Sequence, residues 1–215
     1  PISLILSMAV GAAVGLINGF FIVKVKMNAF IVTLASFIWV RGMVVALSGG
    51  RSAQNLADEI RWFAIQRVFG LPVSAYIAIF CFVVFSVLMA KTRFGRHLTM
   101  IGGNEVAAYR AGIKVQKVLI ITFMLSGMIA ALAGWLLAIR TSGATANLGT
   151  GMLFNAFAAV VIGGVSLKGG VGLLPGVYAG VLLLSSINTA ITLMRLPPEF
   201  TQVIHGLLVL AAVLL

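Results

Sequence analysis

The sequence predicts an all-α fold: a polytopic bundle of about seven transmembrane helices with one short helix in a cytoplasmic connection. Two observations lead to this prediction. The 215 residues are 61% hydrophobic and only 9% charged, whereas a soluble domain has about 25% charged residues. Apolar runs also recur between short polar connections, and about 20 apolar residues are enough to cross a bilayer. Membrane lipid is therefore the expected solvent of most of the chain.

Six expected spans follow in order at 2–23, 29–47, 73–90, 118–139, 154–167 and 172–193, and a seventh begins near residue 200. The segment 154–167 is shorter and rich in glycine, so it either crosses the bilayer or re-enters it. Residues 1–215 are interpreted as one transmembrane domain. Because the chain begins at Pro1 and stops at Leu215 inside apolar runs, we expect a piece of a longer protein.

Lysine and arginine residues orient the chain. The net charge is +11, from 15 Lys and Arg against 4 Asp and Glu. The connection 91–117 is the most basic, and cytoplasmic loops of membrane proteins collect Lys and Arg. We therefore expect 91–117 to be cytoplasmic and 48–72 to lie outside. Nucleic acid is not an expected partner, because no soluble domain remains to hold a basic groove.

Small residues recur at every fourth position in three of the expected spans. The rows are Gly11, Gly15 and Gly19; Gly172, Gly176 and Gly180; and Ser126, Ala130 and Gly134. In lipid, such rows let helix backbones approach closely, and dispersion then replaces the missing hydrophobic driving force. They predict a tightly packed bundle.

No set of residues indicates that this chain performs chemistry itself. Its four acids all lie in connections, whereas proton-driven carriers keep titratable groups at membrane depth. They are Asp58, Glu59, Glu105 and Glu199. In the glycine-rich stretch 163–170, Lys168 is followed by glycine, so the hydroxyl that a phosphate-binding loop supplies for Mg²⁺ is missing. We expect no enzyme activity, no cofactor and no metal site in this chain, so energy for uphill transport must come from a partner.

A short helix is predicted within the cytoplasmic connection 91–117. Asn104 is a good N-cap, and Glu105 and Arg110 complement the helix dipole at its two ends. Gly112 suits the left-handed position that follows a helix. A helix of about eight residues is marginal alone in water. We therefore expect it to dock, either on a partner protein or on its own bundle.

The residues around this cap are small. Gly102 and Gly103 are expected to let the chain turn sharply into Asn104 without side-chain clashes. The alanines of this helix are expected to give it a smooth outer surface that a partner can approach closely: Ala107, Ala108 and Ala111.

Four stretches resemble a known family. Residues 92–96 read TRFGR, 102–113 read GGNEVAAYRAGI, 158–170 read AAVVIGGVSLKGG, and 28–34 read NAFIVTL. Together with Asn18-Gly19, they are similar to the ribose/galactose-type (monosaccharide) permeases of ATP-binding-cassette importers. The resemblance extends over essentially the whole chain. Family permeases are longer, and their N-terminal helices are not in this sequence.

The resemblance implies a permease subunit in the bacterial plasma membrane that forms the pathway for a small solute. Among small solutes, the resemblance favours a sugar. It implies a cytoplasmic ATPase subunit that binds ATP and Mg²⁺, an extracytoplasmic solute-binding protein, and a second permease copy in a homodimer or heterodimer. Segment 91–117 becomes the coupling loop to the ATPase. The coupling residues are expected to be Gly102, Gly103, Asn104, Glu105, Ala108 and Gly112. Related permeases carry nucleosides or branched-chain amino acids, so the solute stays open.

Asparagines at membrane depth are the candidates for the solute path. Asn18, Asn155 and Asn188 could bind a sugar, because polar side chains in lipid-depth helices are costly unless they are used or paired. The alternative role is hydrogen bonding between helices. The competing function is a secondary carrier or channel: the missing intramembrane acids argue against it, and sodium-driven uptake stays open.

Overall fold

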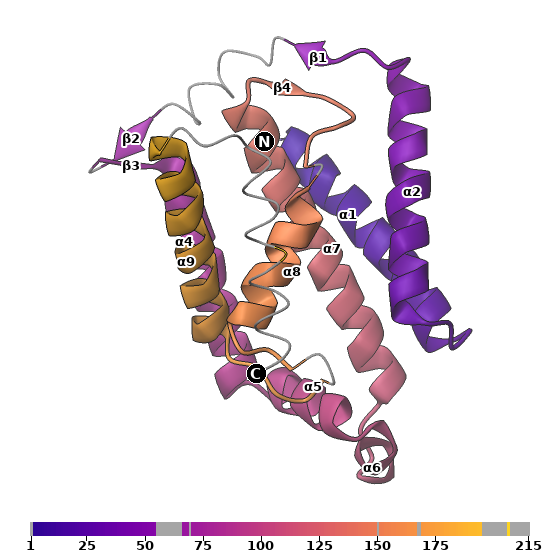
Figure 1. Cartoon of the computed structure of the whole chain (residues 1–215). Coiled ribbons are helices and arrows are strands. Elements are labelled where there is room, and N and C mark those ends of the chain that lie inside the picture. Colours follow the sequence, from indigo (N-terminus) through magenta and orange to yellow (C-terminus); the bar gives the residue numbers. More distant parts are fainter. Residues whose placement is uncertain are drawn as a thin grey trace. The chain divides into compact units, whose positions relative to one another are not determined.

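A computed structural model describes residues 2–54, 66–68, 70–149, 151–166, 169–194 and 206 (Figure 1). In these residues the chain is almost entirely helical, which confirms the predicted all-α fold. The helices are α1 (Ile2–Val23), α2 (Ala29–Ser48), α4 (Val73–Lys91), α5 (Arg93–Gly103), α6 (Glu105–Arg110), α7 (Val115–Arg140), α8 (Met152–Ile162) and α9 (Leu174–Leu193). Four two-residue strands, β1 (Ala53–Gln54), β2 (Arg67–Val68), β3 (Leu71–Pro72) and β4 (Gly143–Ala144), form two small antiparallel pairs.

Five of the described helices, α1, α2, α4, α7 and α9, are long and apolar enough to cross a membrane. Their ends agree with the expected spans to within about three residues. The expected span 154–167 differs, because α8 has only 11 residues. At about 1.5 Å per residue it extends roughly 17 Å, which is about half of a hydrocarbon core of about 30 Å. The expected seventh span, from near residue 200, lies outside the described residues.

One compact unit comprises residues 1–81 and 114–148, and in it α1 packs along α7. The first glycine row forms this contact, as predicted. A Cβ added to Gly11 would lie 2.5 Å from Ala131 Cβ, and one on Gly15 would lie 2.9 Å from the carbonyl carbon of Phe123. No side chain fits in that space, so glycine sets the distance between the two backbones.

The row that α7 contributes differs from the predicted one. Residues Phe123, Gly127 and Ala131 meet the glycines of α1, whereas Ser126, Ala130 and Gly134 are exposed. An added Cβ on Gly134 would meet nothing within 4 Å. The two rows lie side by side on one helix and both contain small residues, so composition alone did not select the row that faces α1.

Polar contacts join the remaining elements of this unit. Strands β1 and β4 pair Ala53 with Ala144, and Arg41 of α2 donates a hydrogen bond from Nη2 to Asn147 Oδ1. The pairing of β1 with β4 ties the connection after α2 to the connection after α7. Asn28 caps α2 by accepting the backbone N–H of Phe30 at 2.9 Å.

The second compact unit comprises residues 82–113 and 149–215. In it α8 packs against α9 through the second glycine row, as predicted: Gly176 lies against Gly163, and Gly180 against Ala159. The third member, Gly172, precedes α9 and faces Val165. Because higher numbers on α8 meet lower numbers on α9, the two helices are antiparallel.

Candidate functional site

The end of α4 and the start of α5 form a tight corner. Thr92 caps α5 by accepting the backbone N–H of Gly95 at 3.3 Å, and its hydroxyl donates to the Leu88 carbonyl at 2.6 Å. Gly95 is buried, and an added Cβ there would lie 2.5 Å from Met89 Cα. Glycine is therefore required where α5 turns away from α4, a turn that Figure 1 shows plainly. Segment 92–96 was noted in the sequence only as part of a family motif, and this corner is its physical reason.

Asn104 makes the turn between α5 and α6. Its backbone is extended, with φ −158° and ψ 104°, and its N–H donates to the Met100 carbonyl while its Oδ1 accepts the Ala107 N–H at 2.9 Å. One residue therefore ends α5 and caps α6. The expectation for Gly102 and Gly103 was wrong: they do not turn the chain into the cap, because both belong to the last turn of α5.

Helix α6 has six residues, two fewer than expected, and is closed at its far end as predicted. Gly112 has φ +81°, the left-handed conformation that favours glycine. The backbone N–H of Gly112 donates to the Tyr109 carbonyl at 3.0 Å, and that of Ile113 to the Ala108 carbonyl at 3.2 Å. This pair of bonds is the Schellman motif. Both ends of α6 are thus satisfied by local hydrogen bonds, which fixes a very short helix.

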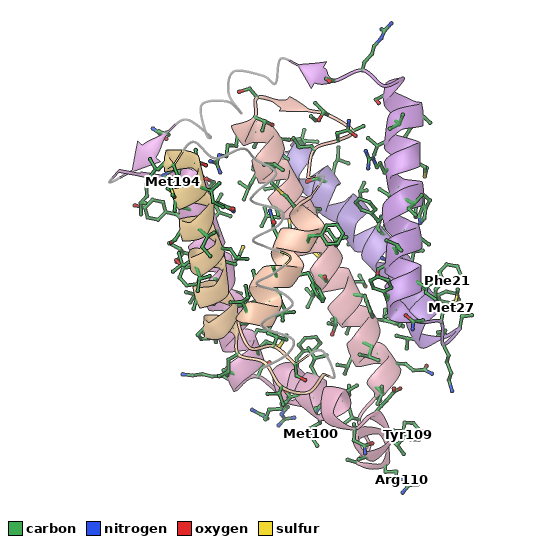
Figure 2. All side chains as sticks on the ribbon, in the orientation of Figure 1. Phe21, Met27, Met100, Tyr109, Arg110 and Met194 are labelled. Atoms are coloured by element: carbon green, nitrogen blue, oxygen red, sulfur yellow. The ribbon has the colours of Figure 1, made fainter. Side chains whose placement is uncertain are left out.

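The predicted alanine surface of α6 is correct in part: Ala107 and Ala111 are exposed, but Ala108 is buried, at 2% exposed, since six residues cannot present every alanine outward. The side chains that project are Val106, 61% exposed, and Tyr109, 72% exposed. Figure 2 shows Tyr109 and Arg110 pointing away from the ribbon. α6 therefore offers an apolar and aromatic surface between an acid, Glu105, and a base, Arg110.

The loop between α8 and α9 meets the end of α5 through backbone atoms. A Cβ added to Gly102 would lie 2.9 Å from Gly170 Cα, and one on Gly169 would lie 2.9 Å from the Gly102 carbonyl oxygen. Residues 167 and 168 of this loop lie outside the described part. The contact places Gly169 and Gly170 on the same side of the membrane as α5 and α6.

Of the three candidate asparagines, Asn18 is already paired. Its Oδ1 accepts a hydrogen bond from the Oγ of Ser36 on α2, and Ser36 is 6% exposed. This bond between α1 and α2 is the packing role that stood as the alternative to solute binding.

Asn155 and Asn188 fall towards the same end of the α8–α9 hairpin. The antiparallel register pairs Ala159 with Gly180 and Gly163 with Gly176, so residue 155 is level with about residue 184 of α9. Asn155 lies in the first turn of α8. The Oδ1 of Asn188 is buried without a hydrogen-bond partner among the described residues, and an unsatisfied buried acceptor is uncommon in folded proteins.

Hydroxyl groups that the sequence pattern had not singled out lie beside Asn188. Ser185, Thr189 and Thr192 lie at helical spacing on the same side of α9 and are exposed. Thr189 donates to the Ser185 carbonyl and Thr192 to the Asn188 carbonyl, each at 2.9 Å. The hydroxyl donors of Thr189 and Thr192 are thus satisfied inside the helix, while the lone pairs of these two oxygens remain able to accept hydrogen bonds. Their spacing in the sequence could have shown this polar face.

These features define a class. Apolar helices long enough to cross a membrane, packed through glycine rows, together with a short helix capped at both ends, define a multi-pass helical membrane protein. The profile of the family described as "Branched-chain amino acid transport system / permease component" matches residues 1–213, and the chain belongs to this family.

The similar proteins are named as permeases for sugars. The chain is 42% identical over 200 residues, 92% of its length, to the L-arabinose transport system permease protein AraH of Escherichia coli K12. It is 35% identical over 212 residues to the ribose import permease protein RbsC of that organism, and 38% identical over 200 residues to the RbsC of Bacillus subtilis. These matches confirm the resemblance to monosaccharide permeases. They also place the chain in the bacterial plasma membrane.

The chain spans 60% of the length of AraH and 66% of that of the E. coli RbsC. The match to the E. coli RbsC includes 97% of the residues of this chain. No solved structure matches the chain.

Proposed function

We propose that this chain is the membrane-spanning permease subunit of an ATP-binding-cassette importer and forms part of the pathway for a monosaccharide. The observation that carries the proposal is the 42% identity over 92% of the chain to an L-arabinose permease. The ribose permeases match over a similar share of the chain. Arabinose and ribose are both pentoses, so the favoured solute is a pentose or a closely similar sugar and not a branched-chain amino acid.

The energy for uptake comes from a separate cytoplasmic ATPase that binds ATP and Mg²⁺. Helix α6 is the proposed contact, because exposed Val106 and Tyr109 between two charged ends suit a protein partner better than water. A second permease copy, identical or different, and an extracytoplasmic solute-binding protein complete the proposed assembly. In the part of the chain that the structure describes, the one carboxylate is Glu105, exposed on α6, so this part offers no acid to a proton-driven carrier.

The proposed solute contacts lie on α8 and α9. A sugar presents hydroxyl donors, and the buried, unpaired Oδ1 of Asn188 is an acceptor beside the hydroxyl oxygens of Thr189 and Thr192. Asn155 lies towards the same end of the hairpin. Asn18 is placed in helix packing instead, because its Oδ1 is engaged by Ser36.

Reconstitution tests this function. The full-length permease, with its ATPase and binding protein, would be placed in proteoliposomes, and uptake of radiolabelled L-arabinose, ribose and leucine would be measured with ATP or a non-hydrolysable analogue. We expect saturable pentose uptake with ATP and no uptake with the non-hydrolysable analogue. Uptake that proceeds without the ATPase and follows a sodium or proton gradient would assign the chain to the secondary carriers.

A further inference from the structure

Two glycine pairs from distant parts of the sequence meet backbone to backbone. Gly102 and Gly103 end α5, and Gly169 and Gly170 lie in the loop before α9. A Cβ on Gly170 would lie 2.7 Å from the Gly103 nitrogen and 2.8 Å from its Cα. Real Cβ atoms essentially never come this close to other atoms, so the contact exists only because side chains are absent.

The requirement for glycine differs across the contact. Gly169 and Gly170 have φ of +90° and +77°, so the loop itself favours glycine there. Gly102 has an ordinary helical conformation, in which alanine would be the better residue. Glycine at position 102 is therefore explained by the neighbouring loop and not by its own backbone.

The loop is held at both of its ends. Gly164, with φ +77°, follows α8, and the backbone N–H of Val165 donates to the Val160 carbonyl at 3.2 Å. The Ser166 N–H donates to the Val171 carbonyl at 2.9 Å. On the other side of the contact, Gly102 is two residues from Asn104, whose cap begins α6. The contact thus joins two segments that each have local backbone hydrogen bonds, without a flexible side chain between them.

We propose that the contact of Gly102 with Gly169 and Gly170 is the positioning contact that carries movement of α6 to the α8–α9 hairpin. The proposal rests on the function proposed above. Through the chain, α6 reaches α8 only by way of the whole of α7, whereas this contact joins the end of α5 directly to the loop that ends α8 and begins α9. Because backbones in contact cannot slide past each other by a rotamer change, a displacement of α6 displaces the hairpin that carries Asn155 and Asn188.

Gly102→Ala is the decisive variant, because it adds one methyl group at the contact and leaves the helical backbone favourable. Gly134→Ala on α7 is the matched control: it is also a helical glycine, and its added Cβ meets nothing within 4 Å. The complete transporter would be purified and reconstituted with each variant. ATPase co-purification, ATP hydrolysis, sugar uptake and thermal unfolding of the permease would be measured.

We expect Gly102→Ala to retain the ATPase but to lower the uptake per ATP hydrolysed by about 2- to 30-fold, the range produced by mutations within coupled networks. Gly134→Ala should keep the wild-type ratio. A lower unfolding temperature with an unchanged ratio would make the contact purely structural and overturn the proposal, while the permease function stands. Failure of the wild-type chain to retain an ATPase would overturn both.

A second measurement avoids any change at the contact. Met100 on α5 and Val171 in the loop are 51% and 70% exposed, and neither belongs to the proposed ATPase surface, so spin labels at both positions, in a Cys81→Ala background, should leave the packing and the ATPase contact intact. We expect their distance to stay constant between the nucleotide-free and ATP-bound transporter, because the two segments move together. A distance that changes with ATP would show that α5 moves without the hairpin and would overturn the proposal.

Discussion

The side-chain Oδ1 of Asn104 accepts a hydrogen bond from the backbone N–H of Ala107 at 2.9 Å, and the N–H of Asn104 itself donates to the last turn of α5. Asn104→Ala should destabilise α6 by about 1 kcal/mol, the usual cost of losing an N-cap. ATPase co-purification should fall, while the membrane helices stay folded. Asn104→Asp keeps the capping oxygen and should retain the ATPase; equal loss in both variants would contradict a capping role.

Ala108 and Tyr109 are neighbours with opposite exposure, so substitutions there should separate folding from binding. Ala108→Trp places a large ring at a position that is 2% exposed, and overpacking typically costs about 1–3 kcal/mol. We expect a lower unfolding temperature for the isolated permease. Tyr109→Ala should leave that temperature unchanged and weaken ATPase association. Normal association of Tyr109→Ala would move the partner surface away from α6.

The α1–α7 contact should be sensitive to a single methyl group. Gly15→Ala would place a Cβ 3.0 Å from Met124 Cα and nearer still to the Phe123 carbonyl, so the helices must separate. We expect a loss of about 1–3 kcal/mol, measured as a lower unfolding temperature in detergent. Gly134→Ala should be neutral. Equal stability of the two variants would show that the helices adjust without cost.

Asn18 and Asn188 should behave differently when each is changed to alanine. Asn18→Ala breaks the bond to Ser36, and such bonds between membrane helices contribute about 0.6 kcal/mol on average. A double-mutant cycle with Ser36→Ala measures this coupling. Asn188→Ala should instead lower sugar uptake at an unchanged unfolding temperature. Normal uptake by Asn188→Ala, at equal expression, would remove that residue from the path.

Topology can be tested with single cysteines in a Cys81→Ala background. Ser52 and Thr99 are both exposed, and the basic connection 91–117 is expected to be cytoplasmic. An impermeant thiol reagent should label Ser52→Cys in intact cells, and Thr99→Cys only after the cells are opened. Labelling of position 99 alone in intact cells would reverse the orientation.

Length and hydropathy were enough to predict the described membrane spans and their ends, because lipid imposes a long apolar run on any crossing helix. The caps at Asn104 and Gly112 were predictable for a similar reason, since they depend on a few adjacent residues. The packing row on α7 was not predictable, because the row that meets α1 contains the large Phe123 beside Gly127. The row of smaller residues lies elsewhere on the helix, and the choice depends on where α1 lies.

The site was predicted less completely. The local sequence pattern was enough to predict the helix α6. It wrongly predicted that Ala108 is exposed, because the burial of a residue depends on the segments that pack over it. Gly102 was assigned to a turn, since its partners, Gly169 and Gly170, are more than sixty residues away in the sequence. The polar face of α9 at Thr189 and Thr192 was present in the spacing and was overlooked.

The packing of α1 on α7 also sets an order of events during synthesis. About 90 residues separate the two helices, and at roughly 5–20 residues per second the ribosome adds them on the order of ten seconds. During that time the glycine face of α1 lies against lipid or a transient protein neighbour, with its complementary surface not yet made. The glycine face of α1 therefore lacks its α7 partner throughout the insertion of α2 and α4.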